Sequence, residues 1–144
     1  MVTISQLTWK IDDKSIESIY GMNRHLFPSL NQFRQFLLTP MEPFRTEVVL
    51  YLNADIYGDT YDDNTDYYIY DNLNGICPLD IMGAIYTYYN SSLNPAEHQR
   101  LIEMNPYFEH RVLHERIDAL REQIWLLAAY PWKNGYEVRF AELY

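Results

Sequence analysis

Three prolines divide the second half of the chain into segments with helical periodicity. Pro78 suits the first position of a helix, where no backbone N–H is needed, and the apolar residues after it recur at helical spacing until about Asn90. Asn94-Pro95-Ala96-Glu97 is typical of a second helix start, because an asparagine cap is followed by a proline and by a glutamate that can reach back to the cap. We expect this helix to run to about Met104.

The third segment predicts the longest helix, from Asn105-Pro106 to about Ala129, with Pro131 as its stop. Apolar residues form a stripe along it, and charged residues of both signs occupy the opposite side, as on a solvated helix face. The stripe consists of Val112, Leu113, Ile117, Leu120, Ile124, Leu127 and Ala128. The second half of the chain should therefore contain three consecutive helices.

Three other segments have the composition of β-strands. Glu47–Leu52 is rich in β-branched and aromatic residues, and Asp66–Tyr70 returns after a loop-like stretch, so the two should form an antiparallel hairpin. Asn134-Gly135 is a turn signal, and Tyr136–Ala141 then alternates as a half-buried strand does. The predicted fold class is α+β, with a small antiparallel sheet packed against a C-terminal set of three helices.

The N-terminal residues should cover an edge or the second face of that sheet. Val2–Trp9 alternates like a short strand, and a polar connection follows it. Phe27-Pro28-Ser29 then opens a short helix that continues through Leu38. Because 144 residues leave little room for a second core, residues 1–144 are expected to form one domain.

The charge of the chain is acidic and local. Lys plus Arg is 11 and Asp plus Glu is 20, so the net charge is −9. No basic residue lies between Arg45 and Arg100, and the acids of that stretch account for the whole excess. They are Glu47, Asp55, Asp59, Asp62, Asp63, Asp66, Asp71, Asp80 and Glu97. Such a surface repels phosphates, which argues against direct binding of nucleic acid or of an anionic membrane.

Tyrosine accompanies these acids. The chain has 14 tyrosines, and tyrosine is enriched in protein contact surfaces because its rigid ring has a polar tip. We therefore predict a surface that binds a basic protein partner. Its residues are Asp55, Tyr57, Asp59, Tyr61, Asp62, Asp63, Asp66 and Tyr68. In the alternative interpretation, the tyrosines pack inward on a strand and the aspartates are merely solvated. Because a core of this size does not readily bury so many hydroxyls, a homodimer is also expected.

Catalytic and metal-binding patterns are weak. His110 and His114 have the spacing of zinc ligands on one helical face, so a small metal-dependent enzyme that uses them and nearby acids is the alternative function. Asp62-x-Asn64-x-Asp66 begins like a calcium loop but lacks the glycine and the glutamate that such a loop needs. Cys77 precedes a helix start and is interpreted as a packed, unreactive thiol. We therefore predict a non-catalytic protein without a cofactor.

The sequence also predicts an intracellular protein. Its single cysteine is unlike the several that small secreted domains carry, and its first residues lack the basic end and apolar run of a signal peptide. No stretch approaches the roughly 18 continuous apolar residues of a membrane span.

Three short pieces of the chain carry a family resemblance. They are the helix pattern of 80–90 with the capped helix start at 93–97, the charged segment of 112–121, and the closing strand of 136–143. Together with Thr39-Pro40 and the strand from Glu47, this order resembles an uncharacterised domain family of mushroom-forming fungi and of giant DNA viruses of amoebae. The resemblance leaves out residues 1–38 and implies a small α+β domain without an assigned activity. The tyrosine and asparagine bias favours the viral branch, which would place the protein in the host cytoplasm, the nucleus or the virion.

Overall fold

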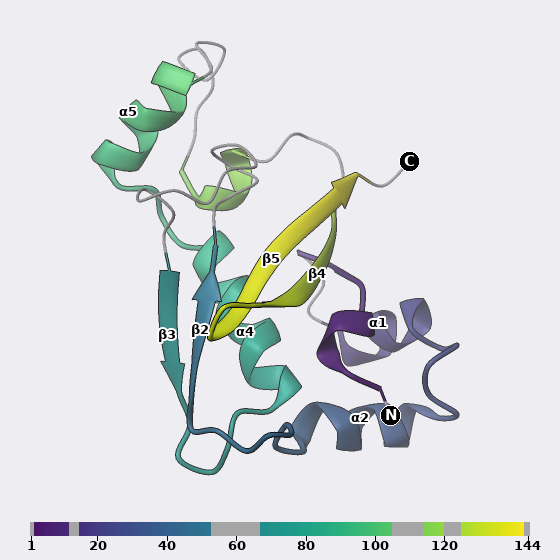
Figure 1. Cartoon of the computed structure of the whole chain (residues 1–144). Coiled ribbons are helices and arrows are strands. Elements are labelled where there is room, and N and C mark those ends of the chain that lie inside the picture. Colours follow the sequence, from purple (N-terminus) through teal and green to yellow (C-terminus); the bar gives the residue numbers. More distant parts are fainter. Residues whose placement is uncertain (1, 12–14, 53–66, 105–113, 120–124, 143–144) are drawn as a thin grey trace.

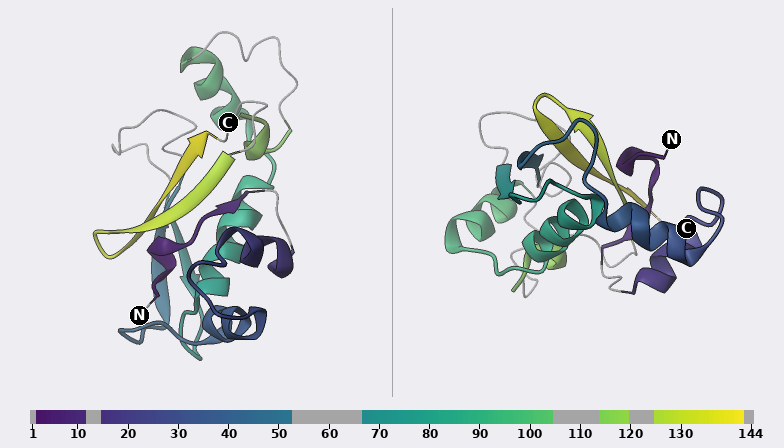
Figure 2. Two further views of the ribbon diagram at one scale, coloured as in Figure 1. Left: turned by 90° about the vertical axis from the view of Figure 1, so that its right-hand side faces the viewer. Right: turned by 90° about the horizontal axis from the view of Figure 1, so that it is seen from below.

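A five-stranded mixed sheet carries helices on one of its faces in the computed structural model (Figures 1 and 2). The structure describes residues 2–11, 15–52, 67–104, 114–119 and 125–142. The elements are η1 (Ile4–Gln6), β1 (Trp9–Lys10), α1 (Ile16–Met22), α2 (Leu30–Leu38), β2 (Glu47–Tyr51), β3 (Tyr67–Asp71), α4 (Pro78–Tyr89), α5 (Pro95–Met104), η3 (Arg116–Ala119), β4 (Trp125–Trp132) and β5 (Gly135–Glu142).

The strand order is β1-β4-β5-β2-β3, and the sheet is not the small antiparallel one that the sequence predicted. Strands β1, β4 and β5 pair antiparallel, and so do β2 and β3. The two groups join through a parallel pairing, in which Val49 of β2 lies opposite Gly135 of β5. This parallel pairing makes the sheet mixed, and the strand order makes β3 one of its two edges.

The long helix predicted up to Ala129 is wrong over its C-terminal part. Residues 116–119 form the short helix η3, and residues 125–132 form strand β4. Leu127, Ala128 and Ala129 are all buried and Tyr130 is exposed, so burial alone does not distinguish a strand from a helix here. Apolar residues at 124, 127 and 128 fit a helical stripe as well as a strand, and pairing with β5 decided between them. Residues 105–113 and 120–124 lie outside the described part.

A two-residue turn, Lys133-Asn134, joins β4 to β5, and Lys133 adopts a left-handed φ of 48°. The turn therefore comes one residue earlier than the Asn134-Gly135 signal suggested. Gly135 is needed for another reason. A Cβ atom at this position would overlap the carbonyl oxygen of Val49 and lie 2.7 Å from the carbonyl carbon. Only a glycine lets β5 approach β2 this closely.

The predicted set of three C-terminal helices is also wrong, because two of the four described α-helices precede β2 and strands close the described chain. Helices α2, α4 and α5 do have the expected bounds. The reciprocal cap of α5 is present, since the N–H of Glu97 donates to Oδ1 of Asn94 at 2.8 Å and the N–H of Asn94 donates to Oε1 of Glu97 at 3.4 Å. Of the predicted strand over residues 2–9, only β1 at its end is observed, and it forms the second edge of the sheet.

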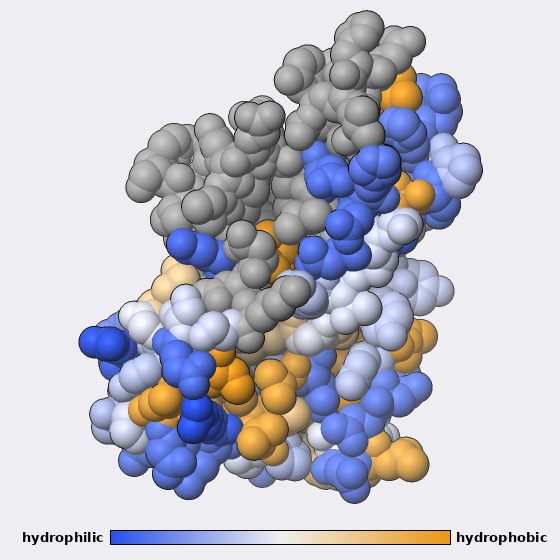
Figure 3. Space-filling view, turned by 180° about the vertical axis from the view of Figure 1, so that it is seen from behind, coloured by the Kyte–Doolittle hydropathy of each residue, from blue (hydrophilic) through white to orange (hydrophobic). Residues whose placement is uncertain are grey.

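The core lies between the inner face of the sheet and helices α1, α2 and α4. Its largest fully buried side chains include Tyr89, Phe33, Leu50 and Leu127. Seen from behind, apolar residues gather in the lower half of the molecule, where these three helices lie (Figure 3). The helices thus cover one face of the sheet in the described structure, and the opposite face carries no helix (Figure 2).

Candidate functional site

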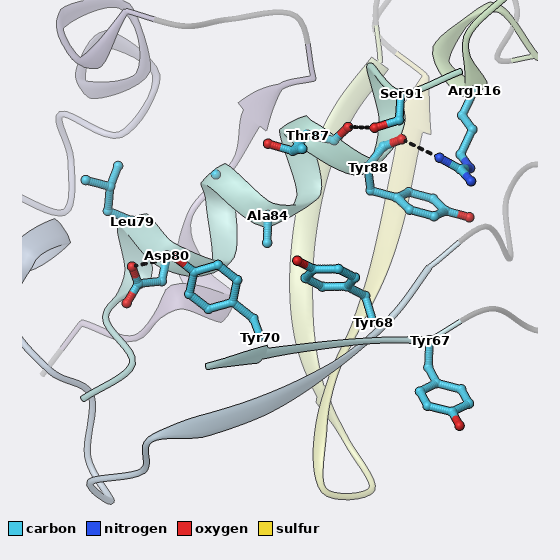
Figure 4. A pocket seen from close by; sticks show the side chains of 11 residues that line it. Tyr67, Tyr68, Tyr70, Leu79, Asp80, Ala84, Thr87, Tyr88, Ser91 and Arg116 are labelled. Atoms are coloured by element: carbon cyan, nitrogen blue, oxygen red, sulfur yellow. Dashed lines mark hydrogen bonds between the residues drawn. The ribbon is translucent and has the colours of Figure 1, made fainter. Parts of the chain in front are cut away.

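A groove of about 770 Å³ runs between β3 and α4. We call it the tyrosine groove, because Tyr68, Tyr70 and Tyr88 line it together with Thr87 and Arg116. Figure 4 shows that Tyr68 and Tyr70 point from β3 toward α4, whereas the ring of Tyr67 lies on the other side of the strand. On the α4 side, the lining includes the two small residues Gly83 and Ala84, which leave room between the helix and β3.

Asp80 closes one end of the tyrosine groove and is fully engaged in hydrogen bonds. It accepts from the backbone N–H of Cys77 at 3.0 Å, from the side-chain amide of Asn72 at 2.9 Å and from the hydroxyl of Tyr70 at 3.5 Å. Burial raises the pKa of Asp80, but these donors outweigh it and hold the pKa below its usual value. Asp80 is therefore an anion that caps α4, and it is unsuited to donate a proton at neutral pH.

Cys77 is the N-cap residue of α4, and its side chain is buried. Burial raises the pKa of the Cys77 thiol, and the adjacent Asp80 carboxylate adds to this effect. The thiol thus stays protonated at neutral pH and is a poor nucleophile. The structure shows the packed side chain that the sequence predicted, and the low reactivity of Cys77 stays a prediction.

Arg116 closes the other end of the tyrosine groove. Its guanidinium binds both carboxylate oxygens of Glu97 at 2.9 Å and donates to the backbone carbonyl of Tyr88 at 3.1 Å. The same guanidinium lies over the ring of Tyr88, 4.2 Å from its centroid. This positive charge is neutralised by Glu97, so the middle of the groove offers aromatic rings and hydroxyl groups between two compensated charges.

The opposite face of the sheet carries a second group of aromatic side chains, which we call the aromatic face. Residues at equivalent register positions share a face, and Tyr130, Glu137, Tyr51 and Tyr67 form one row across four strands. Trp132, Gly135, Val49 and Ile69 form the next row. The ammonium group of Lys133 lies 5.8 Å from the ring centroid of Tyr51 and 5.9 Å from that of Trp132.

A smaller hollow of about 320 Å³ lies between β1, α1, α2 and α4. Its wall is mainly apolar and includes Trp9, Ile16, Leu37 and Met82. Ligand sites combine apolar walls with a few converging polar groups. The described residues of this hollow lack such a set, and we assign no role to it.

Of the predicted partner-binding residues, only Tyr68 belongs to the described part of the chain. Asp55, Tyr57, Asp59, Tyr61, Asp62, Asp63 and Asp66 lie outside it, as does the partial calcium-loop pattern. Tyr68 is 46% exposed, and its neighbour Tyr67, which the sequence analysis did not include, is 65% exposed. Strand alternation would have suggested Tyr67 as well, had the sequence shown that β3 is an edge.

The metal-site alternative required His110 and His114 to lie on one helix, but His114 is not in a helix. This residue is exposed and precedes η3, and its backbone N–H donates to the Asp118 carboxylate at 3.0 Å. His110 lies outside the described residues. Within the ranges that the structure describes, no three His, Cys, Asp or Glu side chains are grouped to hold a metal ion. Likewise, none of the described helices is long and apolar enough to cross a bilayer.

The chain matches no family model, no curated protein and no solved structure.

Proposed function

We propose that this protein is a non-catalytic interaction module that binds a basic protein partner through the acidic, tyrosine-rich stretch of residues 55–71. The observation that carries this proposal is the exposure of Tyr67 and Tyr68, which follow the acidic segment directly and lie on an edge strand. An exposed tyrosine ring leaves apolar surface in water. A partner that covers the ring gains the favourable free energy of burying that surface.

The described acids near β3 also favour a cationic partner. Glu47 and Asp71 are both exposed and lie directly opposite each other in the β2–β3 ladder. Like charges in such a pair destabilise a sheet, so a cation bound beside them would relieve the repulsion. No Lys or Arg occurs between Arg45 and Arg100, so Arg45, two residues before Glu47, is the nearest cation in sequence to these acids.

Several wider expectations stay predictions. They are membership of the fungal and viral domain family, an intracellular location, and a homodimer. A histone-like or capsid-associated protein would have the required charge. The solution mass from light scattering at tens of micromolar tests the homodimer, and a monomer mass would rule it out.

The proposed function is tested by binding kinetics with a purified histone as the basic probe. Replacing Asp59, Asp62, Asp63 and Asp66 by Asn should slow association and weaken its salt dependence, because exposed charges act beyond contact range and are screened by salt. Tyr68→Ala should instead speed dissociation, because an anchor side chain is lost after docking.

Leu38→Ala is the control, because Leu38 is also an exposed apolar side chain, at 65%, but lies on α2 rather than on the sheet. It should change neither rate. If the quadruple Asn variant associates at the wild-type rate and salt tolerance, the acidic stretch is only a solvated loop.

A further inference from the structure

The outer edge of β3 presents backbone groups that no strand of the described chain pairs. The N–H of Asn72 donates to the carbonyl of Thr46 at 2.8 Å, and these residues lie opposite each other in the β2–β3 register. Hydrogen-bonded pairs alternate along an antiparallel ladder, so Tyr68 and Tyr70 also bond to β2. The N–H and C=O groups of Tyr67, Ile69 and Asp71 therefore point outward from the sheet.

The side chains of β3 supply contacts on both faces of this edge. Tyr68 and Tyr70 border the tyrosine groove, with ring centroids 6.5 Å apart. Tyr67 and Ile69 lie on the aromatic face, and Ile69 is 46% exposed. A strand added beside β3 would thus place alternate side chains in the groove and on the aromatic face.

The chemistry around this edge selects cations. In the tyrosine groove, the chain's own Arg116 already lies over the Tyr88 ring, and on the aromatic face Lys133 lies over Tyr51 and Trp132. Rings of tyrosine and tryptophan attract Lys and Arg through their negative faces. Together with the exposed Glu47 and Asp71, both sides of the edge are suited to Arg and Lys side chains.

We infer that the basic partner binds as an extended peptide segment, which adds a strand to the sheet along the outer edge of β3 and directs Arg or Lys side chains to the tyrosine groove. This inference rests on the proposed function and adds the shape of the partner to it. A second copy of the chain is the poorer occupant, because each copy carries a net charge of −9 and like-charge repulsion would oppose β3-to-β3 pairing.

The test uses a synthetic peptide in which arginine alternates with valine as the probe. The main variant is Ile69→Pro, which removes an outward N–H without removing a hydrogen bond to β2, as edge strands tolerate. Its matched control is Ile69→Ala, which removes the same side chain and keeps the N–H. We expect Ile69→Pro to bind the peptide at least about tenfold more weakly than Ile69→Ala, because a pairing site is lost and the ring obstructs the edge.

A second measurement follows backbone amides. Hydrogen exchange at Tyr67, Ile69 and Asp71 should slow when the peptide binds, whereas the amides of Tyr68 and Tyr70 should be protected already. A peptide methylated on alternate backbone nitrogens keeps its charges but loses the donors that pair with β3, so it should bind about as weakly as the parent peptide binds Ile69→Pro.

The outcomes separate this inference from the proposed function. If the methylated peptide and Ile69→Pro bind as well as their controls, strand addition is refuted, while charge-driven binding to the acidic stretch stands. If neither basic peptide binds wild-type protein, both proposals fail. A dimer of the free protein that Ile69→Pro turns into a monomer would show that a second copy occupies the edge, which overturns the inference.

Discussion

Arg116 and Glu97 form an ion pair that is largely removed from water, with side-chain exposures of 16% and 8%. Both side chains also make hydrogen bonds outside this pair. Glu97 caps α5 through Asn94, and Arg116 binds the carbonyl of Tyr88 at the end of α4. One salt bridge thus joins two helices and η3, although the two residues are 19 positions apart in sequence.

Replacing Arg116 by Ala should lower the free energy of unfolding by about 3–5 kcal/mol, because it leaves the buried Glu97 carboxylate without its partner. Urea denaturation measures this change. Arg34→Ala is the control, since the pair of Arg34 with Glu17 is exposed and should contribute less than about 1 kcal/mol. A loss of the same size in both variants would contradict the assigned role of Arg116.

Ionisation of the Asp80 carboxyl group makes the stability of the protein depend on pH in the acidic range. Its pKa is lowered in the folded state, so the stability it confers is present above its unfolded pKa, about 4, and is lost as the pH falls through the folded value. Asp80→Asn should cost about 1 kcal/mol at neutral pH, because the carboxylate cap of α4 is lost. The gap between the two proteins should close as the pH is lowered below about 4. Thermal unfolding over a pH series measures it, and a constant gap would argue against the ionised cap.

At the level of elements, local sequence signals set the helices α4 and α5, whereas pairing with distant strands sets β4. The start of α4 and of α5 is set by a capping residue and a proline that are neighbours in sequence. The sequence therefore predicts the bounds of both helices correctly. Strand β4 has no such local signal. Its apolar residues suit a helix equally, and β4 exists because β1 and β5 pair with its two edges.

The close approach of β2 and β5 predicts a large effect for Gly135→Ala. The added methyl group would meet the backbone of Val49, which cannot move aside like a side chain, so we expect a loss of about 3 kcal/mol or more. Gly83→Ala is the matched control, because, apart from its own neighbours in the α4 backbone, no atom lies within 4 Å of the position its Cβ would take. That variant should gain about 0.5–1 kcal/mol. Similar effects of the two substitutions in urea denaturation would exclude this parallel pairing.

At the level of the whole molecule, the net charge of −9 is concentrated in one stretch of the chain. Repulsion within this stretch opposes the compact state, and salt screens it over about 8 Å at physiological ionic strength. The melting temperature should therefore rise as sodium chloride is added to a low-salt buffer.

The variant with Asn at positions 59, 62, 63 and 66 should melt slightly higher at low salt and respond less to added salt. Circular dichroism at several salt concentrations measures both effects. An equal rise in both proteins would show that the acidic stretch is not the source of the repulsion.

The sequence by itself determined the features that rest on neighbouring residues. These are the bounds of α2, α4 and α5 and the antiparallel pairing of β2 with β3. Only the tertiary structure decided that residues 125–132 form a strand, that Val49 pairs in parallel with Gly135, and that Arg116 reaches Glu97 and Tyr88. The reason is physical. A cap or a turn is a hydrogen bond within a few residues, whereas strand order and buried ion pairs depend on which distant segments the core brings together.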